Sequence, residues 1–77
     1  MPRLTPVPWE RLVCVFEQLG YHLAGQKGSH IKLEKPGSAR PLIIPLYDEV
    51  GLDIINNLMR TAGIKREAFF ALLQNCR

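Results

Sequence analysis

The chain has 77 residues, of which 47% are hydrophobic and 22% are charged. This balance is typical of a globular protein rather than a disordered one, and the length provides only one hydrophobic core, so we predict a single domain over residues 1–77. No apolar run approaches the ~20 residues that a membrane-spanning helix requires, and the N-terminus lacks the apolar core of a signal peptide. We therefore expect a cytoplasmic protein without membrane contact.

The net charge is +3, from ten basic and seven acidic residues. This mild excess permits a polyanionic partner without requiring one. Its distribution is more informative, because Glu34 is the only acid between positions 27 and 40. The basic residues of this segment are Lys27, Lys32, Lys35 and Arg40. Basic residues on a strand and its turns suggest a sheet face that meets phosphates.

The two cysteines lie far apart, with Cys14 inside a predicted helix and Cys76 next to last. Neither belongs to a Cys-x-x-Cys metal motif or to a disulfide framework, so we expect free thiols in a reducing compartment. Only two histidines are present, and no carboxylates cluster at the spacing of metal ligands. We therefore expect no metal site and no cofactor.

Residues 1–8 contain three prolines and are predicted to form an extended N-terminal arm. Thr5 is the candidate cap of the helix that follows, and Gly20 is expected to end that helix in a left-handed conformation. Apolar residues recur at helical spacing between these two signals. They are Trp9, Leu12, Val13, Phe16 and Leu19.

Three short segments bounded by turn residues predict strands, which should form an antiparallel meander. They are residues 21–24, 30–35 and 42–44. In the first strand we expect Tyr21 and Leu23 to face inward, and we expect residues 25–29 to form a turn. The third strand is kept short by the prolines on either side of it.

The segment after the strands predicts two helices. Asp48 is the candidate cap of the first, and its apolar stripe includes Ile54 and Leu58. The second is a short closing helix over residues 65–75, with Phe69 on its apolar face. Because helices must cover one face of a three-stranded sheet, the fold class is α+β. The architecture is a two-layer sandwich of order α-β-β-β-α with a short extra C-terminal helix.

Alternation in the second predicted strand separates a polar face from an apolar one. The polar face carries His30, Lys32 and Glu34, and the apolar face carries Ile31 and Leu33. Helices can bury the apolar face, which leaves an imidazole and a lysine facing solvent.

The turn before this strand makes His30 the candidate catalytic residue, although a histidine at the start of a strand is usually a solvated surface residue. Gly28 lets the backbone approach a ligand closely, Ser29 offers a hydroxyl and an N–H, and Lys27 and Lys32 lie on either side. An imidazole can transfer protons near neutral pH. Beside lysines that hold a phosphate, it could deprotonate a 2′-hydroxyl for attack on the adjacent phosphorus, which cleaves RNA without a metal.

Several motifs follow one another along the chain. They are Gly20-Tyr21, Gln26-Lys27-Gly28-Ser29-His30, Pro36-Gly37, a β-branched strand ending in Pro45, and Leu58-Met59-Arg60-Thr61-Ala62-Gly63-Ile64 followed by Phe69. In this order they resemble the HicA-type mRNA interferase toxins over almost the whole chain. The Gly-Ser-His triplet between two strands is the sharpest part of the resemblance.

The resemblance implies a fold like that of double-stranded-RNA-binding domains and an mRNA-cleaving activity centred on His30. It also implies a cognate HicB-type antitoxin that blocks the site. The RNA-binding residues would be Gln26, Lys27, Gly28, Ser29 and Lys32. Two positions depart from the family pattern: Gly25 stands where members commonly carry an arginine, and Ile31 where many carry a polar residue or a second histidine. Two other functions stay open, a non-catalytic double-stranded-RNA-binding module and a small protein that docks a partner.

Overall fold

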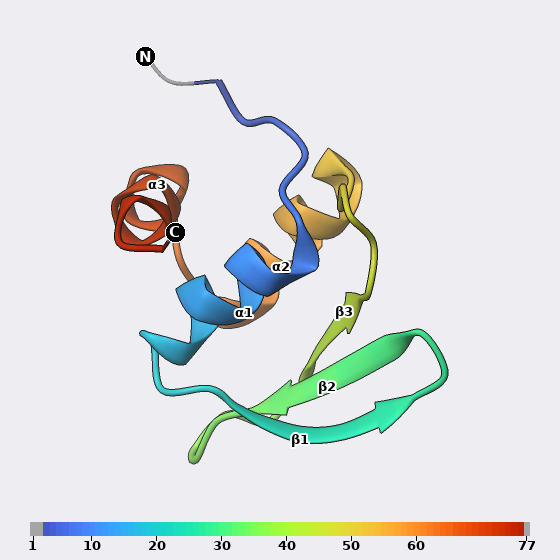
Figure 1. Ribbon diagram of the computed structural model, residues 1–77. Coiled ribbons are helices and arrows are strands. Elements are labelled where there is room, and N and C mark those ends of the chain that lie inside the picture. The colour runs from blue at the N-terminus through green and yellow to red at the C-terminus, as the bar shows by residue number, and fades with distance from the viewer. Residues whose placement is uncertain (1–2, 77) are drawn as a thin grey trace.

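The computed structural model describes residues 3–76 and shows a three-stranded antiparallel sheet with helices on one face (Figure 1). The elements are α1 (Trp9–Glu17), β1 (His22–Lys27), β2 (His30–Glu34), β3 (Leu42–Pro45), α2 (Leu52–Ala62) and α3 (Arg66–Gln74). The strands lie in the order β1-β2-β3. This confirms the predicted α+β class and the α-β-β-β-α order with a further helix at the C-terminal end. None of the described helices is long and apolar enough to cross a membrane.

The hydrophobic core lies between the sheet and the helices. In β2 the burial alternates along the strand, so Ile31 and Leu33 are buried whereas His30, Lys32 and Glu34 are exposed, as predicted. Helices α1 and α2 both contact β3. The largest fully buried side chains are Phe16, Phe69, Leu12, Leu33, Leu42, Ile44, Ile55, Val15 and Val50. The helices therefore cover one face of the sheet and leave the polar face of β2 open to solvent.

The described part of the predicted N-terminal arm, residues 3–8, contains no helix and packs against the core, whereas residues 1 and 2 lie outside the described residues. Leu4 and Val7 are buried. Val7 forms an antiparallel bridge with Val50, through hydrogen bonds of 3.3 and 2.8 Å between their backbone groups. The arm thus holds the segment that leads into α2.

This bridge also explains why both predicted helix caps are wrong. The N-cap of α1 is Pro8 instead of Thr5, and the N-cap of α2 is Gly51 instead of Asp48. The pairing of Val7 with Val50 keeps both of these segments extended, so each helix begins only after the paired residue. Neither Pro8 nor Gly51 has a polar side chain, so neither cap residue makes a side-chain hydrogen bond to the first turn of its helix.

Leu23 lies on the inward face of the sheet, as predicted, but it is not buried in the core. Tyr21 is buried as expected, but 59% of the Leu23 side chain is exposed. Leu23 lies on the same face as its partner Leu33, the face that the helices cover. Because β1 is an outer strand and the helices contact β3, the side chain of Leu23 lies beyond the helical layer.

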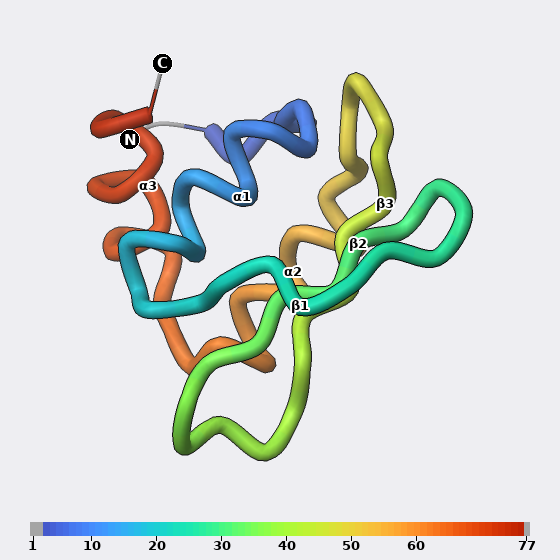
Figure 2. Tube along the Cα trace, turned by 60° about the horizontal axis from the view of Figure 1, so that its bottom comes forward, coloured from blue at the N-terminus to red at the C-terminus, as the bar shows by residue number. Residues whose placement is uncertain are grey.

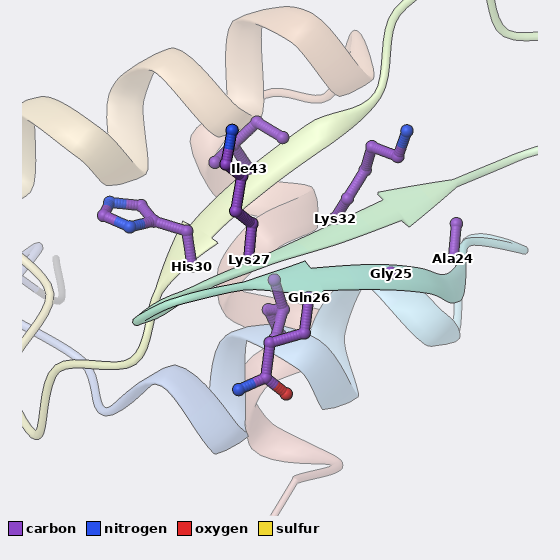
Figure 3. A pocket seen from close by; sticks show the side chains of 8 residues that line it. Ala24, Gly25, Gln26, Lys27, His30, Lys32 and Ile43 are labelled. Atoms are coloured by element: carbon purple, nitrogen blue, oxygen red, sulfur yellow. The ribbon is translucent and has the colours of Figure 1, made fainter.

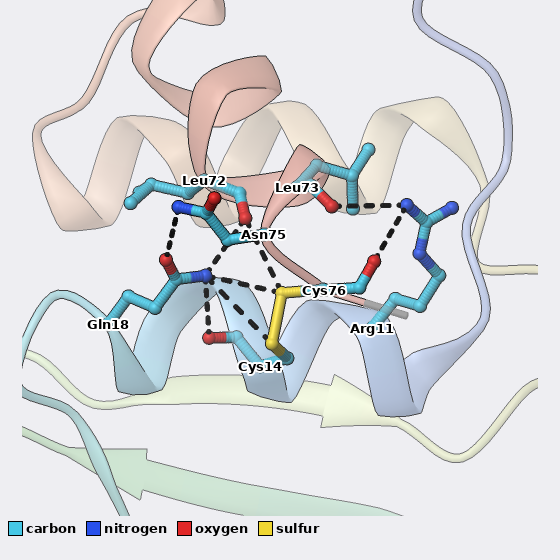
Figure 4. Close-up of a disulfide and its surroundings, with 7 residues drawn as sticks. All are labelled: Arg11, Cys14, Gln18, Leu72, Leu73, Asn75 and Cys76. Carbon is cyan, nitrogen blue, oxygen red and sulfur yellow. Dashed lines mark hydrogen bonds between the residues drawn. A yellow bond between two sulfur atoms is a disulfide. The ribbon is translucent and has the colours of Figure 1, made fainter.

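The expectation of free thiols is wrong, because Cys14 and Cys76 form a disulfide across 62 residues of sequence (Figure 4). The bond joins α1 to the residue that follows α3 by two positions. Arg11 and Gln18 add hydrogen bonds to carbonyl oxygens in the last turn of α3, at 3.1 and 2.9 Å. These contacts hold α3 beside α1, farther from the sheet than α1 itself (Figure 2).

Candidate functional site

The candidate site is built on the hairpin turn between β1 and β2. Lys27 pairs with His30 across a turn of two residues, Gly28 and Ser29, so the turn is shorter than the predicted 25–29. Gly28 has a φ of 60°, and Ser29 has a negative φ. This is the order expected of a type II′ hairpin turn, which places glycine first because the left-handed backbone strains other residues. The Gln26 amide supports the turn by donating a hydrogen bond to the Gly28 carbonyl at 3.2 Å.

A bulge in β1 determines which face Lys27 occupies. The strand pairing skips Ala24, because Leu23 and Gly25 pair with consecutive residues of β2. Without the extra residue, simple alternation from Leu23 would place Lys27 on the helix-covered face. The bulge reverses the alternation, so Gly25 and Lys27 lie on the uncovered face. This irregularity therefore brings Lys27 beside His30.

The uncovered face forms an open depression of about 640 Å³. Its lining residues are Ala24, Gly25, Gln26, Lys27, His30, Ile31, Lys32 and Ile43. In Figure 3 the side chains of Lys27, His30, Lys32 and Ile43 project to the same side of the sheet, whereas Gln26 projects to the opposite side. The structure thus brings the two lysines and the histidine together, and it separates Gln26 from them.

The imidazole of His30 is exposed, and within residues 3–76 it has no hydrogen bond or ion pair. Its aromatic neighbour is Tyr47, whose ring centroid lies 6.5 Å away at an interplanar angle of 67°. Sequence reasoning missed Tyr47. The available signal was the antiparallel pairing of β3 with β2, because His30 pairs with Pro45 and the chain reaches Tyr47 two residues later. The Leu46 N–H donates to the Ser29 carbonyl at 2.8 Å, which holds this segment against the turn.

The two lysines differ in their electrostatic surroundings. Lys32 Nζ lies 3.4 Å from Glu34 Oε2, and both side chains are about half exposed. Such a surface pair is worth only ~0.2–1 kcal/mol, so a phosphate can compete with Glu34 for Lys32. Lys27 has no ion pair within the described part of the chain and stands directly opposite His30. Lys27 is therefore the cation best placed beside the imidazole.

The other basic residues of the 27–40 segment do not join this site. The Nζ of Lys35 lies 5.7 Å from the centroid of the Tyr21 ring. Lys35 follows the C-terminal end of β2, whereas His30 is at the N-terminal end of that strand. Arg40 is in the connection from β2 to β3, at the same far end. Because an extended strand rises roughly 3.3 Å per residue, both are well separated from His30. The positive charge near the imidazole comes from Lys27 and Lys32.

Gly25 leaves room in the depression. It pairs with Lys32 on the uncovered face, and a Cβ added to it would have no atom within 4 Å. A Cβ at this position would therefore point into open space. Among residues 3–76, no group of three or more His, Cys, Asp or Glu side chains is arranged to share a metal ion.

The structure is thus a small α+β protein whose three-stranded sheet presents a histidine and two lysines on its open face, beside a Gly-Ser turn. The family model described as the HicA toxin of bacterial toxin–antitoxin systems matches residues 9–64. The match covers more than half of the chain, so this protein belongs to the HicA toxin family and is a toxin of a toxin–antitoxin system. It includes α1, the sheet and α2, and ends before α3. A comparison with curated protein sequences gave no match.

Proposed function

We propose that this toxin is a metal-independent endoribonuclease that cleaves mRNA, with His30 as the general acid–base. The observation that carries the proposal is the pairing of an exposed His30 with Lys27 on the uncovered face of the sheet. Membership of the HicA toxin family supports a toxic activity, and the exposed imidazole supplies a group that can transfer protons.

The proposed reaction is attack of the RNA on its own backbone. Lys27 and Lys32 bind the scissile phosphate, and the neutral imidazole of His30 takes the proton from the adjacent 2′-hydroxyl. The 2′-oxygen forms a bond to phosphorus, and the bond from phosphorus to the 5′-oxygen breaks. The imidazolium then returns the proton to the leaving 5′-oxygen, so the histidine ends neutral and the product carries a 2′,3′-cyclic phosphate.

The hairpin turn supplies the remaining proposed RNA contacts. Gly28 and Ser29 are exposed beside His30, where the backbone N–H groups and the Ser29 hydroxyl can bind phosphate oxygens. The Gln26 amide lies on the opposite side of the sheet, so we assign it an indirect role through its hydrogen bond to Gly28.

The proposed protein partner is a HicB-type antitoxin that covers His30, and the proposed location is the cytoplasm, where mRNA is available. Such a complex should not cleave RNA, because the imidazole is blocked. Co-expression with the neighbouring reading frame, followed by affinity purification, tests this partner. Recovery of the toxin alone, with no adjacent small frame, would contradict it.

The central experiment is cleavage of a labelled mRNA by purified protein with EDTA present. His30→Ala should lower the rate by ~10²- to 10⁴-fold, which is the usual contribution of general acid–base catalysis. The matched control is His22→Ala, because His22 is also exposed on a strand but pairs with Glu34 at the far end of the sheet. Equal cleavage by wild type and His30→Ala would remove His30 from the mechanism.

A non-catalytic double-stranded-RNA-binding module is the second candidate. The observation that favours it is Gly25, which leaves the depression without the cation that an arginine would add there. In this case the wild-type protein would bind an RNA duplex firmly and would cleave neither duplex nor single-stranded RNA.

A further inference from the structure

The side chain of Tyr47 has an exposed position that the fold does not explain. It is 47% exposed, and Ile43, on the same strand-and-loop segment, is 46% exposed. Large apolar surfaces exposed next to a functional residue commonly mark a binding site. The Tyr47 ring makes an edge-on contact with the imidazole of His30, which leaves much of the ring surface free.

The backbone around Tyr47 is fixed on both sides. The Leu46 N–H donates to the Ser29 carbonyl at 2.8 Å, and the Trp9 N–H donates to the Tyr47 carbonyl at 3.1 Å. Both are backbone bonds, so they do not depend on the side chain at position 47. A segment held in this way loses little backbone freedom when the side chain that it carries binds a ligand, which favours affinity.

The position of Tyr47 relative to Lys27 suggests what the ring binds. Because β2 is the middle strand, Lys27 on β1 lies on one side of His30 and Tyr47, just after β3, lies on the other. A cation suits the phosphate of a nucleotide, and an exposed aromatic face suits its base. The imidazole between them would then lie at the ribose, where the 2′-hydroxyl is.

We propose that Tyr47 stacks on the nucleobase next to the scissile phosphate, and that the site therefore takes single-stranded RNA. In a duplex the faces of that base are covered by its neighbours, whereas a base in a single strand can turn onto an aromatic ring. This inference rests on the proposed RNA-cleaving function and adds its substrate class and a substrate-binding residue.

The test measures binding of a fluorescent single-stranded RNA in a His30→Ala background, so that the probe is not cleaved. Adding Tyr47→Ala should weaken binding roughly 5- to 150-fold, the usual effect of losing one stacked base, whereas Tyr47→Phe should keep the affinity. The salt dependence should stay unchanged in Tyr47→Ala, because no phosphate contact is lost. Leu23→Ala is the matched control, since Leu23 is exposed and apolar but lies on the opposite side of the sheet. Circular dichroism of each variant checks the fold.

Unchanged affinity in Tyr47→Ala would overturn the inference, and so would an equal loss in Tyr47→Phe, which would indicate a contact to the hydroxyl. Loss of antitoxin binding in Tyr47→Ala with RNA affinity unchanged would assign the ring to the protein partner, and would also overturn it. A cleavage assay separates the two proposals. If wild type cleaves RNA and Tyr47→Ala leaves KM unchanged, the stacking role fails alone. If wild type does not cleave but Tyr47→Ala weakens binding, the catalytic proposal fails and the stacking role is supported.

Discussion

The disulfide between Cys14 and Cys76 should account for a large share of the stability of this small domain. Linking residues 62 positions apart removes conformational entropy from the unfolded chain. The chain-entropy relation gives about 4 kcal/mol for a loop of this size, and measured values commonly fall below it. A domain of 77 residues has a free energy of unfolding of roughly 4–12 kcal/mol. Loss of the bond should therefore lower this free energy by ~2–4 kcal/mol, at least about a sixth of the total.

Urea unfolding of the oxidised protein and of a Cys14→Ser/Cys76→Ser variant measures this effect. The half-buried Trp9 at the start of α1 provides a fluorescence signal, and circular dichroism follows the helices. The double variant should unfold at a lower urea concentration, and its melting temperature should fall by on the order of 10–25 °C. Reductant should lower the stability of the wild type to the same level and leave the double variant unchanged.

A thiol titration tests whether the native protein contains the Cys14–Cys76 disulfide. Protein purified without reductant should show no free thiol until it is unfolded and reduced. Two reactive thiols in the native protein, or identical urea midpoints for wild type and the double variant, would refute the disulfide as a source of stability. Because α3 packs on α1 away from the sheet, the double variant should still cleave RNA at a temperature where it stays folded. The titration also bears on the proposed cytoplasmic location, since disulfides are rare in reducing compartments.

Four further substitutions test the depression and the turn. Lys27→Ala should weaken RNA binding in a titration and lower the salt slope by ~1, and Lys32→Ala should have a smaller effect because Glu34 already pairs with Lys32. Gly28→Ala should lower the free energy of unfolding in urea by ~1–2 kcal/mol, because its φ of 60° strains a residue with a Cβ. Gly25→Arg should raise RNA affinity and steepen the salt slope, since the added cation enters an open part of the depression. Weaker binding by the arginine variant would contradict this geometry.

The sequence predicted the features that depend on neighbouring residues. Alternation in β2 is local, so the exposure of His30 and Lys32 and the burial of Ile31 and Leu33 followed from the pattern. Gly63 ends α2 in a left-handed conformation, which is also a local feature because glycine adopts this backbone without strain.

The features that the sequence did not predict depend on segments distant in the chain. Cys14 meets Cys76 only because α3 packs on α1, and Asp48 fails as a cap only because Val7 pairs with Val50. The exposure of Leu23 reflects how far the helical layer extends, which no pattern within β1 encodes. In each case the outcome depends on contacts between segments that are distant in the chain, which the local sequence pattern does not contain.

The candidate site depends both on a local sequence motif and on contacts between segments that are distant in the chain. The Gly-Ser turn is local and places His30 at the start of β2, but Lys27 reaches the same face only through the bulge at Ala24. Tyr47 depends on the pairing of β3 with β2, which places Pro45 opposite His30 and Tyr47 two residues later. The position of the imidazole therefore depends on the motif, whereas the positions of its neighbours Lys27 and Tyr47 depend on backbone features outside the motif. Substitutions at those features can change RNA affinity while the histidine itself stays in place.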